Sequence, residues 1–200
     1  MSNNQTSRAP RGNDQWLKQY YFSRAAFSVL WVAAALTIGR HSFAVAAALL
    51  ILYPAWDALA NVIDAARSGG LAANRSQAIN VAASSVMTIA VILALTMNMN
   101  WVLGAFGLWA IFSGLLQLGT AVRRWKTSGG QWAMILSGGQ SAVAGALFIF
   151  QAQMPQEPSI STVAGYAGVG AFYFLVSAIW LTIALSRRSD APLGNSTSRQ

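Results

Sequence analysis

The sequence WVLGAFGLWAIFSGLLQLGTAV at positions 101–122, with WAMILSGGQSAVAGALFIF at positions 132–150, decides the fold. Neither run contains a charged residue, and the short basic segment RRWKTSGGQ separates them. At about 1.5 Å of rise per residue, a helix made of either run is long enough to cross a hydrocarbon core about 30 Å thick. Helices of soluble proteins carry a polar face, which both runs lack. The stretch therefore predicts a transmembrane helical hairpin whose turn is basic.

The overall composition agrees with a chain embedded in lipid. Apolar residues make up 55% of the 200 positions and charged residues only 9%, whereas soluble domains carry about 25% charged residues. The net charge of +8 comes from short basic clusters between apolar runs. Membrane topology explains these clusters without a nucleic-acid partner. The chain has no cysteine, which excludes disulfides, thiolate metal sites and a cysteine nucleophile.

Four further apolar segments extend the hairpin to a predicted all-α bundle of six transmembrane helices. They lie at 25–38 (with the aromatic residues 20–22 as an interfacial belt), 43–66, 78–95 and 163–185. Pro155 and Pro158 lack a donor N–H and disfavour a helix, so we expect a loop between the last two spans.

The polar ends of the chain predict two tails around one membrane domain. We expect disordered tails at 1–19 and 187–200, and the six-helix domain at 20–186. Cleavage of a signal peptide after Ala44 is the competing interpretation of the first apolar segment. The long polar stretch that precedes this segment disfavours cleavage.

The basic residues predict the orientation of the bundle. With six spans, all thirteen Lys and Arg residues except Arg40 fall on the side of the two tails, and Arg24 is counted among these tail-side residues. Cytoplasmic loops carry the excess of Lys and Arg in multi-pass proteins. The distribution predicts that both termini lie in the cytoplasm.

The even-numbered spans resemble one another at their tail-side ends. These ends read YPAWDALANVIDAAR at 53–67, WAIFSGLLQLGTAVR at 109–123 and YFLVSAIWLTIALSR at 173–187. Each begins with an aromatic residue, has Asp or Ser four positions later, and closes with Arg. Ser-Gly-Gly also recurs in the loops that follow the first two. The pattern predicts a helical hairpin used three times.

The run FSGLLQLGTAVRRWKTSGGQWAMILSGGQSAVAGALFIF, followed by a loop with proline, resembles the HdeD-like acid-resistance family of short-repeat membrane proteins. Shared features are a Gly-rich helix that ends in basic residues, a turn, and a Trp-led helix. The resemblance is best over 101–186 and fainter over 20–100. It implies a non-enzymatic bacterial inner-membrane protein, with some members linked to acid or envelope stress. It supplies no catalytic residues and no cofactor.

Small residues predict how the helices pack. In lipid, helices associate through close van der Waals approach, which Gly and Ala allow. Such residues follow one another at Gly138, Ala142 and Gly145 of the fifth span, and Gly-rich stretches at 104–114 and 165–170 suggest similar notches in the fourth and sixth spans. We expect Phe148 of the fifth span to face lipid.

Few polar residues lie inside the spans, and three of them share one helical face. Asp57, Asn61 and Asp64 stand at i, i+4 and i+7. Asp64 is expected to pair locally with Arg67. Asp57 lies about 15 Å of helix before Arg67, near mid-bilayer, where an ionised carboxylate costs at least about 2.5 kcal/mol. No charged partner for Asp57 is evident at that depth.

Two glutamines complete the candidate intramembrane polar site. Gln117 of the fourth span and Gln140 of the fifth are placed to hydrogen-bond across their hairpin. The one histidine, His41, falls in an outer loop, and the scattered acidic residues predict no metal site.

Two functions remain open at this point. The first is a non-enzymatic membrane protein of the HdeD-like type, whose partners are the lipid bilayer and another copy or an unknown membrane protein. The second is a small proton- or ion-coupled transporter or channel that uses Asp57. The surroundings of Asp57 discriminate between them: full packing against a helix favours the first, and a water-accessible cavity favours the second.

Overall fold

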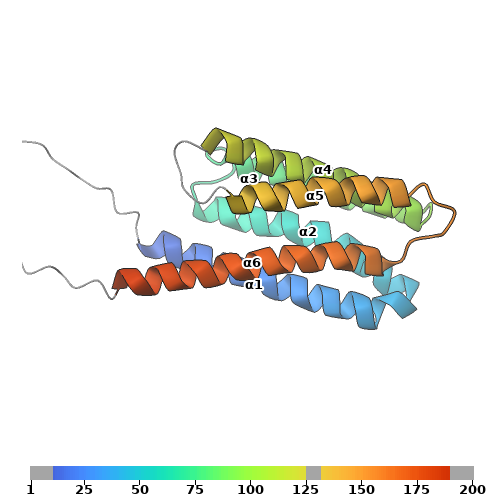
Figure 1. Ribbon diagram of the computed structural model, residues 1–200, viewed down its shortest axis with the longest axis horizontal. Helices are drawn as coiled ribbons and strands as arrows, with labels where there is room; N and C mark the ends of the chain where they lie inside the picture. Colours follow the sequence, from blue (N-terminus) through green and yellow to red (C-terminus); the bar gives the residue numbers. More distant parts are fainter. Residues whose placement is uncertain (1–10, 125–131, 190–200) are drawn as a thin grey trace, which may run out of the picture.

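The computed structural model describes residues 11–124 and 132–189, which form six α-helices and one short 3-10 turn (Figure 1). The helices are α1 (Arg11–Thr37), α2 (Phe43–Arg67), α3 (Arg75–Leu95), α4 (Met99–Arg124), α5 (Trp132–Gln151) and α6 (Ile160–Ser189). The 3-10 turn η1 (Gly39–His41) joins α1 to α2. The predicted all-α fold with six helices is confirmed.

The length and composition of the helices identify a multi-pass membrane protein. Five of them, α1, α2, α3, α4 and α6, are long and apolar enough to cross a bilayer. The part of α5 with the same character, Ile135–Gln151, is shorter. Large apolar side chains cover the outside of the bundle, with Leu30 70% and Trp180 74% exposed. Such a surface is suited to contact with acyl chains rather than water.

The first helix begins earlier than the sequence predicts. Residues 11–19 were expected in a disordered tail, but they form the first turns of α1. Trp16 accounts for this difference, because its indole N–H donates to Asp64 of α2 over 3.1 Å and its ring lies 4.3 Å from the guanidinium carbon of Arg67. At the other end α6 continues to Ser189, and the remaining tail residues lie outside the described ranges.

The helices associate as three closely packed pairs. α1 packs along α6, α2 along α3, and α4 along α5, while α3 also contacts α4 and α1 contacts α2. The backbones of α5 and α6 do not pack closely along their length. The helices thus form a ring in the order α6, α1, α2, α3, α4, α5, whose last junction is loose. α1 packs along α6, from the opposite end of the chain, so the three close pairs are not three consecutive hairpins. The threefold hairpin repeat therefore stays a prediction.

The turn between α2 and α3 shows why Ser-Gly-Gly follows Arg67. Gly69 and Gly70 have φ angles of +95° and +87°, which a residue with a Cβ atom rarely adopts. The N–H of Gly70 donates to the carbonyl of Ala65 over 2.7 Å and so ends α2. The second Ser-Gly-Gly, at 128–130, lies outside the described residues.

The apolar core fills the end of the bundle opposite the tails. Its buried members lie in the second half of α1 and α3 and the first half of α2, α4 and α6, and include Trp31, Leu50, Val91, Val102, Phe106 and Val163. Figure 1 shows α4 and α6 close together at this end and diverging toward the end that holds the start of α1 and the end of α6. The bundle is therefore packed at one end and splayed at the other.

The loop between α5 and α6 is tied to the closed end of the bundle. A carboxylate oxygen of Glu157 accepts from the backbone N–H of Met99 over 3.2 Å, at the start of α4. A carboxylate is favourable there because helix N-termini carry unpaired N–H groups. The amide of Asn100 donates to the carbonyls of Ala152 and Met154. These bonds hold the proline-containing loop over the core.

Glycines let α4 and α5 approach to backbone contact. A Cβ atom on Gly114 would lie 2.5 Å from the carbonyl oxygen of Gly138, and one on Gly145 would lie 2.5 Å from that of Gly107. Ala142 sits between them, with its backbone nitrogen 2.8 Å from the same Gly114 position. Gly138, Ala142 and Gly145 thus face α4, as the small-residue pattern predicts for a helix interface.

Two packing predictions for the neighbouring surfaces are wrong. Gly165 and Gly168 of α6 receive no neighbouring helix, because a Cβ atom at either position would meet nothing within 4 Å. Phe148 of α5 does not face lipid; it is 6% exposed, and its ring centroid lies 5.8 Å from that of Tyr166. Small residues show where a helix could approach, but their presence does not show that one does.

Adjacent glycines of α5 offer a matched test of the α4–α5 contact. Gly138→Ala should lower the melting temperature of the detergent-solubilised protein by several degrees, because overpacking costs about 1–3 kcal/mol. Gly139→Ala, whose new Cβ atom would meet nothing within 4 Å, should leave it unchanged or raise it through the better helix propensity of Ala. Equal effects of the two substitutions in a thermal melt would contradict the packing.

Candidate functional site

A cleft of about 1510 Å³ with a mixed polar and apolar lining occupies the splayed end of the bundle and extends along α5 and α6 as far as Gln151 and Thr162. Described residues of all six helices line it, mainly from the tail-side halves of α1, α2, α3 and α4 and from the long facing surfaces of α5 and α6. The lining combines aromatic and aliphatic side chains with hydroxyls, amides and charged groups. Pockets of this character are the usual sites of ligand binding.

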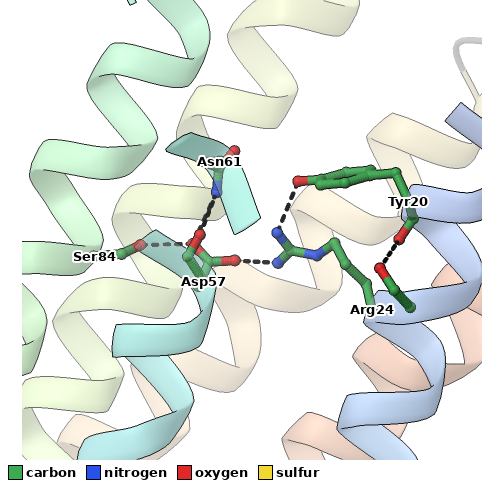
Figure 2. A network of polar contacts seen from close by, with 6 residues as sticks. Tyr20, Arg24, Asp57, Asn61 and Ser84 are labelled. Carbon is green, nitrogen blue, oxygen red and sulfur yellow. Dashed lines mark hydrogen bonds and ion pairs between the residues drawn. The ribbon is translucent and has the colours of Figure 1, made fainter. Parts of the chain in front are cut away.

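An ion pair between α1 and α2 lies in this cleft (Figure 2). The guanidinium of Arg24 donates to Asp57 Oδ1, and the two side chains are 13% and 17% exposed. This corrects two expectations, because Asp57 has a charged partner and Arg24 is not a surface charge of the tail side. Arg24 lies within the apolar stretch Gln15–His41, at a depth that brings it level with Asp57 of the antiparallel neighbour.

The carboxylate of Asp57 also accepts from two uncharged side chains. Ser84 Oγ of α3 donates to Oδ2 over 2.6 Å. The amide of Asn61, one turn along α2, donates to the same oxygen over 3.3 Å and to the Asp57 carbonyl over 2.8 Å. The helical face that the sequence predicts for Asp57 and Asn61 thus brings the two side chains into direct contact. Three helices supply donors to one carboxylate.

The guanidinium of Arg24 is enclosed by aromatic rings. Its carbon lies 4.5 Å from the ring centroid of Phe174 on α6 and 5.6 Å from that of Tyr20 on its own helix. The Tyr20 hydroxyl accepts from Arg24 over 3.0 Å. Cation–π contacts of this kind stabilise a cation that has lost part of its hydration. The pair therefore connects α1 and α2 to α3 through Asp57 and to α6 through Arg24.

Electrostatics explains why both charges are tolerated at this depth. A single buried charge costs several kcal/mol, and a paired, hydrogen-bonded one costs much less. The charges of Arg24 and Asp57 cancel, and the exposed fractions leave both groups in contact with the cleft. Removing only one partner leaves the other charge uncompensated.

Asp64, about two helical turns after Asp57 on α2, makes a second connection to α1 and α3. Its carboxylate accepts from Trp16 Nε1 over 3.1 Å and from Gln77 Nε2 over 3.0 Å. The predicted local ion pair with Arg67 is wrong, because the guanidinium of Arg67 lies over the Trp16 ring instead. Asp64 is 9% exposed and does not line the cleft. It serves as a structural contact at the tail end.

The two glutamines do not join α4 to α5 as predicted. Gln140 Oε1 accepts from the hydroxyl of Tyr173 on α6 over 2.5 Å. Gln117 Oε1 is buried without a hydrogen-bond partner, as are Arg24 Nε and Trp56 Nε1, and all three residues line the cleft. A buried polar atom without a partner costs about 1–3 kcal/mol.

Few titratable groups are available for chemistry in the cleft. Among residues 11–124 and 132–189, no group of three or more His, Asp or Glu side chains could hold a metal ion. His41 is exposed in η1, where its Nε2 accepts from Arg40 Nε over 2.8 Å. The arrangement can bind and orient a solute through the Arg24–Asp57 pair, tyrosine hydroxyls and amides.

Neutralising the ion pair in two steps tests its contribution to stability. Arg24→Gln and Asp57→Asn should each destabilise the protein, by about 3 kcal/mol where the remaining charge stays buried. The double variant Arg24→Gln/Asp57→Asn keeps the shape and removes both charges, so it should melt closer to the wild type than either single variant does. Additive losses in a double-mutant cycle would show that the two side chains do not interact.

Comparison with known proteins adds no evidence to these observations. No protein family, curated protein or solved structure matches it. The assignment to multi-pass membrane proteins rests on the length and hydropathy of the helices. The location of a functional site rests on the cleft and on the ion pair within it.

Proposed function

We propose that this membrane protein is a carrier whose solute occupies the polar cleft, with the Arg24–Asp57 pair as the solute- and ion-coupling site. The observation that carries the proposal is the position of Asp57. It lies in a cleft of about 1510 Å³ rather than in a fully packed helix interface. An ionisable residue in a membrane-spanning segment that lines a cavity is a functional candidate by default.

The distribution of packing favours a carrier over a channel. The end opposite the tails is filled by Trp31, Leu50 and Phe106, each at most 2% exposed, together with the other members of the core. A channel needs a continuous polar path, whereas a carrier in one of its two states is open to one side only. Among α1, α2, α3 and α4 the cleft is limited to one half of the bundle and the apolar core fills the other half, which matches the carrier.

The hydrogen bonds of the ion pair suggest how binding could bias the two states. Asp57 holds donors from α1 and α3, and Arg24 contacts α6. A solute or ion that takes over either partner changes the links between these helices. A ligand shifts a conformational equilibrium only through such differences in its contacts.

The carrier proposal includes a membrane and a topology. We propose a bacterial cell membrane on the basis of the HdeD-like resemblance. The basic residues near the tails support cytoplasmic termini and a cleft open to that side. We also propose α5 as a sixth crossing. It runs antiparallel against α4 from the Gly107–Gly145 contact to the Gly114–Gly138 contact, so it shares the depth of that span.

The HdeD-like resemblance is a second proposal, which concerns the process that the protein serves. It implies a non-enzymatic role in acid or envelope stress. Its support is the pattern over 101–186, where α4 and α5 form the glycine-packed hairpin. A carrier can act in a stress response, so the two proposals are compatible.

Single cysteines on α6 test alternating access, since the natural chain contains none. Ser177 lines the cleft, and Ala167 lies in the core at 0% exposure, about 15 Å of helix away. A membrane-impermeant maleimide should label Ser177→Cys from the side of the tails only. It should label Ala167→Cys from the opposite side only, in those molecules that have switched to the state open to that side.

The lipid-facing neighbour Val176→Cys is the matched control and should remain unlabelled from either side, since Val176 is 45% exposed on the bundle surface and does not line the cleft. Labelling of Ser177→Cys alone would contradict a carrier and leave a fixed one-sided binding cleft. Labelling of both α6 positions from both sides would show a channel instead.

A further inference from the structure

We infer that the ligand of the cleft is an anionic amphiphile, an acyl chain with a carboxylate or phosphate headgroup, that enters from the bilayer between α5 and α6. The inference rests on the proposed function, because it assigns the ligand of the same cleft. Three features coincide at this place: a helix junction whose backbones are not closely packed, an apolar mouth, and a cleft whose lining carries an excess of positive charge.

The junction between α5 and α6 differs from the other contacts of the ring. The backbones of the two helices do not pack closely along their length. A Cβ atom on Gly139 of α5 or on Gly165 of α6 would meet nothing within 4 Å, although both residues line the cleft. On the opposite face of α5, the equivalent atoms would overlap the backbone of α4. On α5, the Gly139 side is thus open to the cleft.

Two hydrogen-bonded side-chain pairs bridge this junction. The Tyr166 hydroxyl shares a hydrogen bond of 2.6 Å with Ser141 Oγ, and the Tyr173 hydroxyl donates to Gln140 Oε1 over 2.5 Å. Hydrogen bonds between membrane helices contribute only about 0.6 kcal/mol on average. Rotation of the tyrosine side chains can therefore open the junction at low cost. The freed hydroxyls and amide can then bind a polar headgroup.

The mouth of the junction is apolar where it meets the bilayer. Leu136, Val143 and Leu147 of α5 and Val169 of α6 line the cleft, and they are 59%, 61%, 55% and 46% exposed. In the membrane such side chains contact acyl chains. A ligand that enters here keeps its apolar part among apolar side chains while its polar end reaches the interior.

The charge of the lining selects the headgroup. The described residues that line the cleft include Arg24, which pairs with the one anion, Asp57, and a second cation, Arg75, which is exposed at the start of α3. A carboxylate or phosphate neutralises the excess cation, and a guanidinium binds both groups through paired N–H donors. Arg24 Nε and Trp56 Nε1 are donors without a partner at the same place. A zwitterionic headgroup carries a cation as well as an anion, so it leaves the excess positive charge of the lining in place.

Photo-crosslinking in nanodiscs tests the inference with the full-length protein. The probes carry a diazirine in the acyl chain and are palmitate, phosphatidylglycerol and, as the zwitterionic reference, phosphatidylcholine. At least one anionic probe should crosslink to the cleft-facing residues of α5 and α6 about tenfold more than phosphatidylcholine, which corresponds to about 1.4 kcal/mol. Palmitate alone would identify a free fatty acid as the ligand, and phosphatidylglycerol alone a phospholipid.

Changes to the ion pair give the sign of the charge effect. Asp57→Asn releases Arg24 from its carboxylate partner and should increase the crosslinking of the anionic probe. The variant Arg24→Gln/Asp57→Asn/Arg75→Gln removes all three charges that line the cleft and should remove the preference over phosphatidylcholine while the protein remains folded. If the preference survives in the triple variant, the charges of the cleft do not select the headgroup and the inference fails.

Two glycines provide matched variants for the entry path. Gly165→Phe fills the α5–α6 junction and should abolish crosslinking to the cleft. Gly119→Phe places the same side chain at another glycine with nothing within 4 Å and away from the cleft, so it should behave like the wild type. Equal crosslinking of both variants would exclude lateral entry at this junction.

Failure of this inference and failure of the carrier proposal are distinguishable. Two-sided cysteine labelling without anionic crosslinks would leave a carrier for a water-soluble solute. Anionic crosslinks with one-sided labelling would leave a lipid-binding cleft that does not alternate.

Discussion

The ion pair between Arg24 and Asp57 is the constraint on which the tail-side half of the bundle depends. Two opposite charges inside membrane helices must meet, because either one alone would be costly in lipid. Their meeting fixes the register of α1 against α2, and the attached contacts of Ser84 and Phe174 extend it to α3 and α6. A second polar contact, between Trp16 and Asp64, repeats the connection nearer the tails.

Different interactions hold the helices together at the two ends of the bundle. Apolar side chains from the helices fill the closed end, and backbone contact at glycines holds α4 to α5. At the open end, hydrogen bonds and charges join helices that stand apart, and a cleft remains between them. Dispersion packing is lost only when helices separate, whereas polar contacts can exchange partners with a ligand. Movement is therefore expected at the polar end.

The helices could be predicted from the sequence, because the length and apolar character of a segment decide whether it can span a membrane. The partners of the polar residues could not. Arg24 and Asp57 are 33 positions apart, and a count of basic residues treats any Arg near the end of a span as a loop residue. Asp64 had a plausible local partner in Arg67, yet Trp16 and Gln77 bind it. The cleft extends along α5 and α6, whose backbones do not pack closely, and composition does not reveal which helices stay apart.

Water inside the tail-side half of the bundle is the central claim, and spin-label accessibility on α4 measures it directly. Ser113 lines the cleft, and its neighbour Phe112 is 45% exposed on the surface of the bundle. A nitroxide at Ser113 should collide with a water-soluble nickel chelate more often than with oxygen. A nitroxide at Phe112 should show the opposite preference. Preference for oxygen at both positions in bilayers of phosphatidylcholine alone, without an anionic amphiphile, would mean that bulk lipid or packed protein fills the space, and would contradict the account.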